Sequence, residues 1–340
     1  MTEGKPRIEL ISRRPGRFNS IEKVFVSLTP HLSLIGFLSS RTLKFGSGLF
    51  GILLNLMLFK PGKVDIHHVT GESHFLCLKL ASENTILTIH DLRFLERRNG
   101  IRGYLIRKFF LEWPLQKLKW ITAVSNATKE HIEREFPDAI GRVRVIPNPV
   151  TITVPENFER SVATTRSNRR ILQVGTEPHK NLEKVIEAIA GRGFELMILG
   201  RLTQDNVNLL RDSQIVFRNH DFLSESELRE AYLNSDVLVF CSLFEGFGLP
   251  ILEAQSLGIP VVTSDIEVLR ETAGDGALFA NPNNAEDIYE RLTLALGDDV
   301  VRDSLISKGY ENVLRFSPER VGKMYRELYK EIMESRSLAK

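Results

Sequence analysis

The sequence predicts an α/β protein of two tandem domains, each built on a mostly parallel sheet covered by helices. Two observations predict this fold class. Short apolar, β-branched runs alternate with helical stretches along the chain, and 340 residues are enough for two domains that each bury a core. The apolar fraction of 42% and the charged fraction of 26% are ordinary for a globular protein, which excludes collagen-like, low-complexity and disulfide-rich classes.

The first half of the chain contains apolar runs of strand length with helical stretches between them. This alternation is typical of β/α units and a parallel sheet. A stretch rich in Thr, Ser, Arg and Asn then follows, which predicts a linker at 151–169 and a first domain at 1–150. The predicted strands are 7–11, 64–68, 85–90, 120–124 and 143–147.

The same alternation restarts after the linker and predicts a second domain at 170–316. A Ser-Pro-Glu start signal then opens the segment 317–336, whose apolar residues at 321, 324, 325, 328, 329, 332 and 333 have helical spacing. This segment is predicted to be one amphipathic helix. The predicted strands of the second domain are 171–175, 195–200, 214–218, 236–241, 260–264 and 277–280, with helices at 181–190, 224–234 and 284–296.

Charge is distributed unevenly between the two halves. Residues 1–150 contain 23 Lys and Arg against 13 Asp and Glu, whereas the remaining residues contain 22 against 30. A basic first half favours an anionic partner such as a membrane surface, a phosphorylated lipid or nucleic acid. The alternative, basic side chains scattered over a solvated face, is equally open because no Lys/Arg run is longer than two.

Several absences predict a cytoplasmic protein. The two cysteines, Cys77 and Cys241, are far apart in sequence and outside any metal-ligand spacing, which fits a reducing compartment. The first residues contain no apolar core of a secretion signal. The longest stretch without Asp, Glu, Lys, Arg or His, 45–59, is shorter than the roughly 20 apolar residues of a membrane-spanning helix.

The segment 244–254, FEGFGLPILEA, carries the most specific pattern in the chain and directly follows a predicted strand. Gly246 and Gly248 permit a tight turn and a close approach of a ligand to the backbone. The following Leu-Pro pair starts a helix whose N-terminus favours an anion. Glu245 and Glu253, with seven residues between them, can reach opposite ends of one extended ligand. Either glutamate alone is ordinary as a helix cap or a solvated residue, but the combination favours a ligand site.

This segment, followed by LGIPVVTSDIEVLRETAGDGALFANPNNAEDI, resembles the donor-binding signature of the retaining family 4 glycosyltransferases, also called glycosyltransferase group 1. The motifs VGTEPHKNL, TIHDL, AVSNATKEHI and VIPNPV match the family in addition. The resemblance implies the GT-B architecture, two Rossmann-like domains whose parallel sheets face each other across a cleft. It implies an acceptor-binding N-terminal domain, a nucleotide-sugar-binding C-terminal domain, and a last helix that crosses back to the N-terminal domain.

The resemblance also implies roles for individual residues of this segment. Glu245 is expected to contact the hydroxyls of the donor sugar, and Glu253 those of the ribose. The backbone of Phe247, Gly248 and Leu249 is expected to contact the sugar and the phosphates.

The motif VGTEPHKNL is a turn from strand to helix that suits a phosphate, with Lys180 projecting from it. Family members commonly carry an Arg in this loop as well as the Lys, but here the stretch is Gly175-Thr176-Glu177. Three alternatives are open. Thr176 and backbone amides suffice, or Arg201 takes part, or activity is weak.

His90 and Asp91 end a predicted strand. The resemblance places His90 beside the donor sugar, where it could polarise a hydroxyl or stabilise developing positive charge, with Asp91 orienting its ring. Three further histidines, His67, His68 and His74, occur in DIHHVTGESH. A metal site is one interpretation of them, and acceptor contact or loop structure is the other, because neighbouring strand residues point to opposite faces of a sheet.

Two further patterns are weighed against their usual context. The segment 46–51 satisfies GxGxxG, but it lacks a buried strand before it and an acidic residue about 20 positions after it, so it predicts a helix after a loop. Ser125 is predicted to cap a helix. No D-x-D occurs in the chain, so we expect no metal and no other cofactor.

We therefore expect a retaining hexosyltransferase of mannosyl or glucosyl type. It would move a sugar from a nucleotide diphosphate donor to a glycan or lipid-linked acceptor in polysaccharide biosynthesis. The alternatives are a nucleotide-sugar 2-epimerase of the same fold and a non-catalytic glycan-binding protein. The basic, aromatic stretch 102–119 predicts reversible association with the anionic inner face of a membrane, with a basic groove for a soluble anionic glycan as the alternative. Nucleic acid is not an expected partner.

Overall fold

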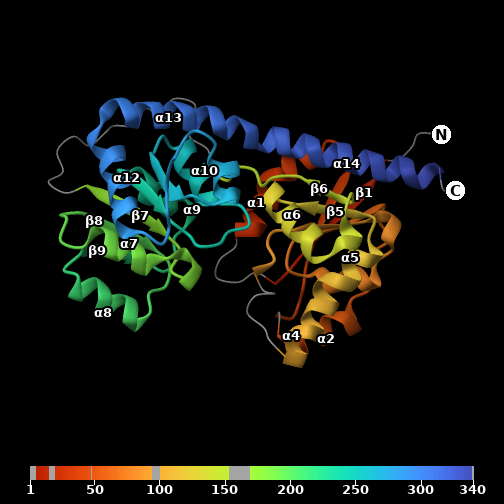
Figure 1. Cartoon of the computed structure of the whole chain (residues 1–340). Helices are drawn as coiled ribbons and strands as arrows, with labels where there is room; N and C mark the ends of the chain where they lie inside the picture. The colour runs from red at the N-terminus through yellow and green to blue at the C-terminus, as the bar shows by residue number, and fades with distance from the viewer. Residues whose placement is uncertain (1–4, 15–19, 47, 94–99, 153–168, 339–340) are drawn as a thin grey trace. The chain divides into compact units, whose positions relative to one another are not determined.

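The computed structural model describes residues 5–14, 20–46, 48–93, 100–152 and 169–338 (Figure 1). The chain divides into two units. The N-terminal unit comprises residues 1–149 and 316–340, and the C-terminal unit comprises residues 150–315. Each unit contains a six-stranded parallel sheet with helices between successive strands, which confirms the predicted α/β class. Most of the predicted linker, residues 153–168, lies outside the described residues.

The sheet of the N-terminal unit has the strand order β2-β1-β3-β4-β5-β6. Its strands are β1 (Arg7–Ser12), β2 (Phe37–Thr42), β3 (Ile66–Val69), β4 (Thr85–Ile89), β5 (Trp120–Ala123) and β6 (Val143–Val145). Its helices include α1 (Ser20–Leu32), α2 (Leu49–Leu58), α4 (Gly100–Arg107), α5 (Trp113–Lys117), α6 (Asn126–Glu135) and α14 (Pro318–Leu338), with a short 3-10 helix η1 (His74–Lys79) and a π-helical turn η3 (Lys108–Glu112).

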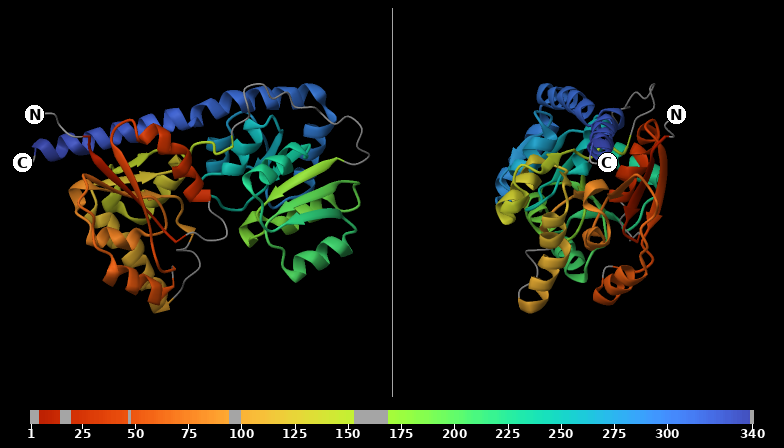
Figure 2. Two further views of the ribbon diagram at one scale, coloured as in Figure 1. Left: turned by 180° about the vertical axis from the view of Figure 1, so that it is seen from behind. Right: turned by 90° about the vertical axis from the view of Figure 1, so that its right-hand side faces the viewer.

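The two faces of this sheet are covered by different helices. Apolar side chains of alternate strand positions, among them Val69, Leu87 and Ile121, form one core with residues of α2, η1 and α5. The positions between them point to the opposite face, as the two-residue period of a strand requires. There α14 packs against α1 and contacts His68 of β3. Figure 2 shows α14 as the long blue helix beside the red α1.

The sheet of the C-terminal unit has the order β12-β11-β10-β7-β8-β9. Its strands are β7 (Arg170–Val174), β8 (Glu195–Leu199), β9 (Val216–His220), β10 (Val237–Phe240), β11 (Val261–Ser264) and β12 (Leu278–Ala280). Its helices are α7 (Leu182–Ile189), α8 (Gln204–Asp212), α9 (Glu225–Leu233), α10 (Leu249–Ser256), α11 (Glu267–Ala273), α12 (Ala285–Gly297) and α13 (Asp299–Val313).

One apolar core of this unit joins α7 and α12 to alternate residues of the central strands, including Ile171 and Val239. Helix α10 packs against α13, α11 and the strands β10 and β11. Along the chain, a helix stands between each two successive strands of this sheet. A connection between parallel strands must return to the end of the sheet where the first strand began, and a helix makes that return.

The predicted strands compare closely with those observed, with one omission. Strand β2 was not expected, because its sequence FLSSRT is short, polar and, at the edge of the sheet, largely exposed. This strand precedes the GxGxxG segment 46–51, within which the predicted helix, α2, begins at Leu49. The last helix and the cap at Ser125, whose hydroxyl accepts the backbone N–H of Thr128 at 3.0 Å, are also confirmed.

Candidate active site

The candidate site of the C-terminal unit lies where its strand order reverses. Strands β8 and β9 follow β7 on one side, whereas β10 pairs with β7 on the other. Open parallel sheets bind ligands outside the carboxyl ends of the strands at such a reversal. The loops that leave β7 and β10 carry Lys180 and Glu245, two of the residues singled out from the sequence.

These two loops are tied to each other. Lys180 Nζ lies 2.6 Å from Glu245 Oε1, and the two side chains are only 16% and 12% exposed. Lys180 Nζ also lies 4.6 Å from the centre of the Phe240 ring, which adds a cation–π contact. The backbone N–H of Leu243 donates to the carbonyl of His179 at 2.8 Å. The structure therefore places a cation and a carboxylate side by side at the strand reversal.

The turn after β7 depends on Gly175. Its φ of +93° lies in the left-handed region, and a Cβ there would come within 2.7 Å of Lys180 Cγ. The next residue, Thr176, donates its hydroxyl to the carbonyl of Arg201 at 2.7 Å. Arg201, named above as a substitute for the absent loop arginine, has an exposed side chain with no partner among the described residues. Its backbone is thus held next to the Gly175 turn.

Helix α10 begins after Gly248, as the Leu-Pro pair predicts. Gly248 has φ +115°, and a Cβ there would lie 2.9 Å from Leu269 Cδ2, so the turn requires glycine. The carbonyl of Phe247 accepts the hydroxyl of Thr272 at 2.8 Å, which ties the turn to α11. Pro250 has no N–H and the N–H of Ile251 donates to the carbonyl of Gly248 at 3.0 Å, so the N–H of Leu249, with the positive end of the helix dipole, is what the start of α10 offers a ligand.

Glu253 lies in α10 and is 9% exposed. Its Oε2 accepts the hydroxyl of Tyr232 at 2.7 Å, and its Oε1 accepts that of Thr151 at 2.8 Å. Burial, followed by the charge of Glu253, raises the pKa of Tyr232 far above its ordinary value. Sequence reasoning missed both hydroxyl partners. Each carboxylate oxygen keeps a second lone pair, so the carboxylate can still accept a ligand hydroxyl.

In the N-terminal unit, His90 and Asp91 follow β4 at the carboxyl end of the sheet. His90 Nε2 lies 2.9 Å from the carbonyl of Thr70, which can only accept, so this nitrogen carries the proton. Burial lowers the pKa of His90, which favours the neutral ring. The other nitrogen, Nδ1, is then a hydrogen-bond acceptor. Asp91 Oδ1 accepts the backbone N–H of Arg93 at 3.1 Å, and its orienting role toward the His90 ring stays a prediction.

The strand order of this unit also reverses, between β1 and β3, and three charged residues lie there, of which sequence reasoning missed Arg13. Arg13 follows β1, and its guanidinium is 2.7 Å from Glu72, which follows β3. The same guanidinium is 3.1 Å from Glu22 in the first turn of α1. Arg13 could have been found from its place directly after a predicted strand.

The histidines of DIHHVTGESH do not converge. His67 Nδ1 lies 3.1 Å from Glu9 Oε2, whereas His68 Nδ1 lies 2.8 Å from the hydroxyl of Tyr329 on the opposite face. His74 Nδ1 contacts the carbonyl of Phe110 at 3.0 Å. Within the described residues, no group of three or more His, Cys, Asp and Glu side chains could hold a metal ion. Each of these histidines has a structural partner instead.

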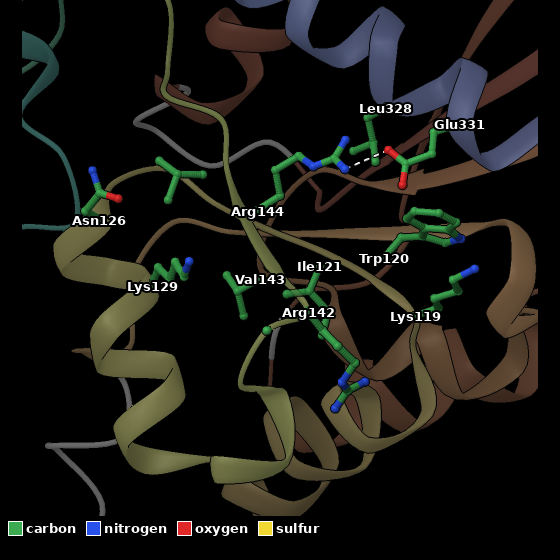
Figure 3. Close-up of a pocket in the computed structure, with 12 residues that line it drawn as sticks. Lys119, Trp120, Ile121, Asn126, Lys129, Arg142, Val143, Arg144, Leu328 and Glu331 are labelled. Carbon is green, nitrogen blue, oxygen red and sulfur yellow. Dashed lines mark hydrogen bonds and ion pairs between the residues drawn. The ribbon is translucent and has the colours of Figure 1, made fainter.

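A separate hollow of about 560 Å³ lies beside the edge strand β6 (Figure 3). Arg144 of β6 reaches across it to Glu331 of α14, with a distance of 2.6 Å between the charged atoms. Arg142 turns away and donates to the carbonyls of Leu115, Leu118 and Asp138. None of the predicted site residues lines this hollow, and the ion pair of Arg144 with Glu331 joins β6 to α14 across it.

The family of the protein follows from this fold and from sequence comparison. Residues 8–154 match the model of Glycosyltransferase Family 4, and residues 156–312 match that of Glycosyl transferases group 1. The chain belongs to the family 4, group 1 glycosyltransferases of GT-B fold.

Two curated relatives and one solved structure show the range of similarity. The O-antigen chain mannosyltransferase RfbU of Salmonella typhimurium is 28% identical over 59% of this chain and 58% of its own length. The O-antigen chain mannosyltransferase B of Escherichia coli is 33% identical over 44% of this chain and 42% of its own length. The chain thus spans about half the length of these relatives. A glycosyltransferase structure from Rickettsia africae has a TM-score of 0.71 at 19% identity, covering 97% of this chain and 99% of that one, so the fold is shared.

None of the helices among the described residues is both long and apolar enough to cross a membrane.

Proposed function

We propose that this protein transfers a hexosyl unit, of mannosyl or glucosyl type, from a nucleotide diphosphate sugar to a glycan or lipid-linked acceptor in polysaccharide biosynthesis. Transfer would retain the anomeric configuration. The names of the relatives, both O-antigen chain mannosyltransferases, support a polysaccharide product and favour mannose. The protein would act in the cytoplasm and associate with the anionic inner face of a membrane, where lipid-linked acceptors are found.

The observation that carries this proposal is the contact of Lys180 with Glu245 at the reversal between β7 and β10. A nucleotide diphosphate sugar presents a dianionic diphosphate next to a polyhydroxylated ring. An ammonium and a helix N-terminus suit the diphosphate, and a carboxylate suits the hydroxyls of the ring. Glu253, in α10, would hold the ribose together with the Tyr232 and Thr151 hydroxyls that it already contacts.

The same groups can serve the chemical step. In front-face transfer the bond from the anomeric carbon to the diphosphate oxygen breaks, the acceptor oxygen bonds to that carbon from the same side, and the acceptor proton passes to the leaving phosphate. Lys180 and the positive end of the α10 dipole with the N–H of Leu249, together with the Gly175 turn, would stabilise the charge that develops on the diphosphate. Neutral His90, whose Nδ1 accepts a hydrogen bond, would take a sugar hydroxyl. No metal or other cofactor is part of this proposal.

The proposal is tested by thermal-shift screening of GDP-, UDP- and ADP-sugars, followed by hydrolysis and transfer assays with the stabilising donor. We expect one donor to raise the melting temperature and to release its nucleotide diphosphate, with activity preserved in EDTA because no carboxylate cluster for Mg²⁺ is present among the described residues. Lys180→Ala should reduce donor affinity, while Lys184→Ala, which changes a partly exposed lysine on α7 paired only with Glu187 among the described residues, serves as the matched control.

Other results would contradict the proposal in different ways. Conversion of the sugar without release of nucleotide diphosphate would identify an epimerase. Absence of both donor binding and donor hydrolysis would favour a non-catalytic glycan-binding protein. Loss of activity in EDTA with rescue by one divalent ion would overturn the metal-independent mechanism.

A further inference from the structure

Helix α2 is apolar on every side, although one of its faces lies at the molecular surface. Its sequence, LFGILLNLML, contains no charged residue. The one strongly polar side chain, Asn55, is buried and donates to the carbonyl of Phe45 at 3.0 Å. A helix that is apolar all round is normally enclosed in a protein core or in lipid. Only half of α2 is enclosed by this chain.

The buried half holds the helix in one orientation. Ile52 belongs to the core of the N-terminal unit, and Leu56 packs against that core. Lys79 Nζ donates to the carbonyl of Leu56 at 2.6 Å and so satisfies one of the last carbonyls of the helix. The opposite face is thereby presented to the outside as a fixed surface.

The exposed half is a continuous apolar stripe. Phe50, Leu53 and Met57 are 74%, 53% and 68% exposed, and their spacing of three and four residues places them on one face of the helix. Leu58 adds a fourth side chain, 61% exposed. Large apolar side chains grouped in this way mark a surface that another apolar phase covers.

The chain around α2 is basic. No Asp or Glu occurs from residue 23 to residue 64, whereas this span contains Lys23, Arg41, Lys44, Lys60 and Lys63. Lys44 precedes the helix, Lys60 and Lys63 follow it, and all three side chains are exposed. An apolar stripe flanked by lysines is complementary to a bilayer whose headgroups are anionic.

The basic stretch 102–119 differs from α2 in this respect. Arg107 is 2.9 Å from Glu135, Lys108 is paired with Glu112, and Lys117 donates to the carbonyl of Leu78 at 2.8 Å. These cations are bound to internal partners. The side chain of Arg102 lies outside the described residues. The exposed large apolar side chains of this stretch, among the described residues, are Tyr104 at 59% and Trp113 at 41%, so α2, with four at 53% to 74%, presents the more exposed apolar surface.

We propose that the outward face of α2, formed by Phe50, Leu53 and Met57, docks on an anionic lipid bilayer, with Lys44, Lys60 and Lys63 among the headgroups. The helix would lie in the interface with its opposite side still packed on the protein. Figure 1 shows α2 at the same end of the N-terminal unit as α4, in the region of the stretch 102–119. The inference rests on the proposed membrane partner but not on the proposed transferase activity.

The test is co-sedimentation of the full chain with vesicles of equal parts phosphatidylglycerol and phosphatidylcholine, without nucleotide or acceptor. We expect binding that weakens as salt is added. The triple variant Phe50→Ser, Leu53→Ser, Met57→Ser should bind on the order of ten-fold more weakly or worse, because three apolar side chains no longer enter the bilayer. The matched control, Val300→Ser with Leu314→Ser, removes two side chains that are 81% and 70% exposed in the C-terminal unit and should bind like the wild type.

A second variant makes the test independent of the triple substitution. Met57→Trp should show a blue-shifted emission and quenching by brominated lipids on addition of vesicles, whereas Val300→Trp should not.

Several results would overturn the inference. They are no vesicle binding by the wild type at low salt, unchanged binding by a folded triple variant, and loss of binding only in Tyr104→Ser with Trp113→Ser. Dissociation of a dimer by the triple variant, with vesicle binding intact, would show that a second copy covers α2. Donor hydrolysis is measured separately, so a protein that binds vesicles without hydrolysing a donor would contradict the proposed function alone.

Discussion

At the scale of the residue, the candidate donor site consists of charged groups whose neighbours decide what they can do. Lys180 is held against Glu245 and over Phe240, so its ammonium has a defined position before any ligand arrives. A diphosphate at the start of α10 would compete with the Glu245 carboxylate for that ammonium. Glu253 differs, because its partners are the neutral hydroxyls of Tyr232 and Thr151.

This difference predicts separate effects for the two glutamates. Glu245→Ala should mainly lower turnover, because contacts to the sugar can strengthen in the transition state. Glu253→Ala should weaken nucleotide binding and also cost about 1–3 kcal/mol of stability, because it leaves the buried Tyr232 hydroxyl without an acceptor. Calorimetric titration measures nucleotide affinity, steady-state kinetics measures turnover, and urea unfolding measures stability.

Tyr232→Phe combined with Glu253→Ala is the control for this prediction. The double variant should regain part of the lost stability, since no hydroxyl is left unpaired, without regaining nucleotide affinity. Equal effects of Glu245→Ala and Glu253→Ala on nucleotide affinity would contradict the division of roles.

At the scale of the element, α14 is attached to the sheet of the N-terminal unit through buried polar groups. His68 Nδ1 contacts the Tyr329 hydroxyl at 2.8 Å, and His68 Nε2 contacts Thr88 Oγ1 at 2.7 Å. Thr88 Oγ1 in turn lies 2.7 Å from Thr122 Oγ1. The chain of contacts links β3, β4, β5 and α14, so the position of the helix depends on hydrogen bonds as well as on apolar packing.

We predict that Tyr329→Phe destabilises the N-terminal unit by about 1–3 kcal/mol, because it leaves His68 Nδ1 buried without a partner. The control is Tyr325→Phe on the same helix, which removes a hydroxyl that is 3.4 Å from Thr88 Oγ1 and should cost less. Urea unfolding followed by tryptophan fluorescence is suitable, because Trp113 and Trp120, the only two tryptophans of the chain, both belong to this unit. An equal or larger cost for Tyr325→Phe would show that the contact to His68 is not important.

At the scale of the whole molecule, the two units differ in their buried histidines. Burial lowers the pKa of His68 to about 3 and that of His74 to about 4, and it also lowers the pKa of His90. All three belong to the N-terminal unit. In the unfolded chain a histidine has a pKa near 6.5, so below that pH the unfolded state binds protons that the folded state does not.

The N-terminal unit is therefore expected to lose stability as the pH falls below about 6.5. His68 and His74 should each remove about 2 kcal/mol between pH 7 and pH 5, because their folded pKa values lie below that window. The urea midpoint by tryptophan fluorescence measures the loss. His74→Gln, which keeps a donor for the Phe110 carbonyl, should make the midpoint less dependent on pH. A midpoint with the same pH dependence in the variant and the wild type would disprove this assignment.

Local patterns in the sequence predicted most of the fold. Apolar β-branched runs indicated 11 strands of the two sheets, because a buried parallel strand needs such a run along its length. The missing strand, β2, has the sequence FLSSRT, whose last four residues are polar, so no apolar run marks it. The start of α10 was also predictable from the local sequence, since glycine and proline act on the backbone at their own positions.

The sequence by itself determined which residues of the site stand close together in the chain, such as Glu245, Gly248 and Glu253, and the resemblance to the family through them. Only the tertiary structure decided which distant groups meet. The contact of Lys180 with Glu245 and that of Tyr232 with Glu253 depend on β10 pairing with β7 and on α9 lying beside α10. The exposure of one face of α2 was decided in the same way, because a uniformly apolar helix does not encode which side the core will cover.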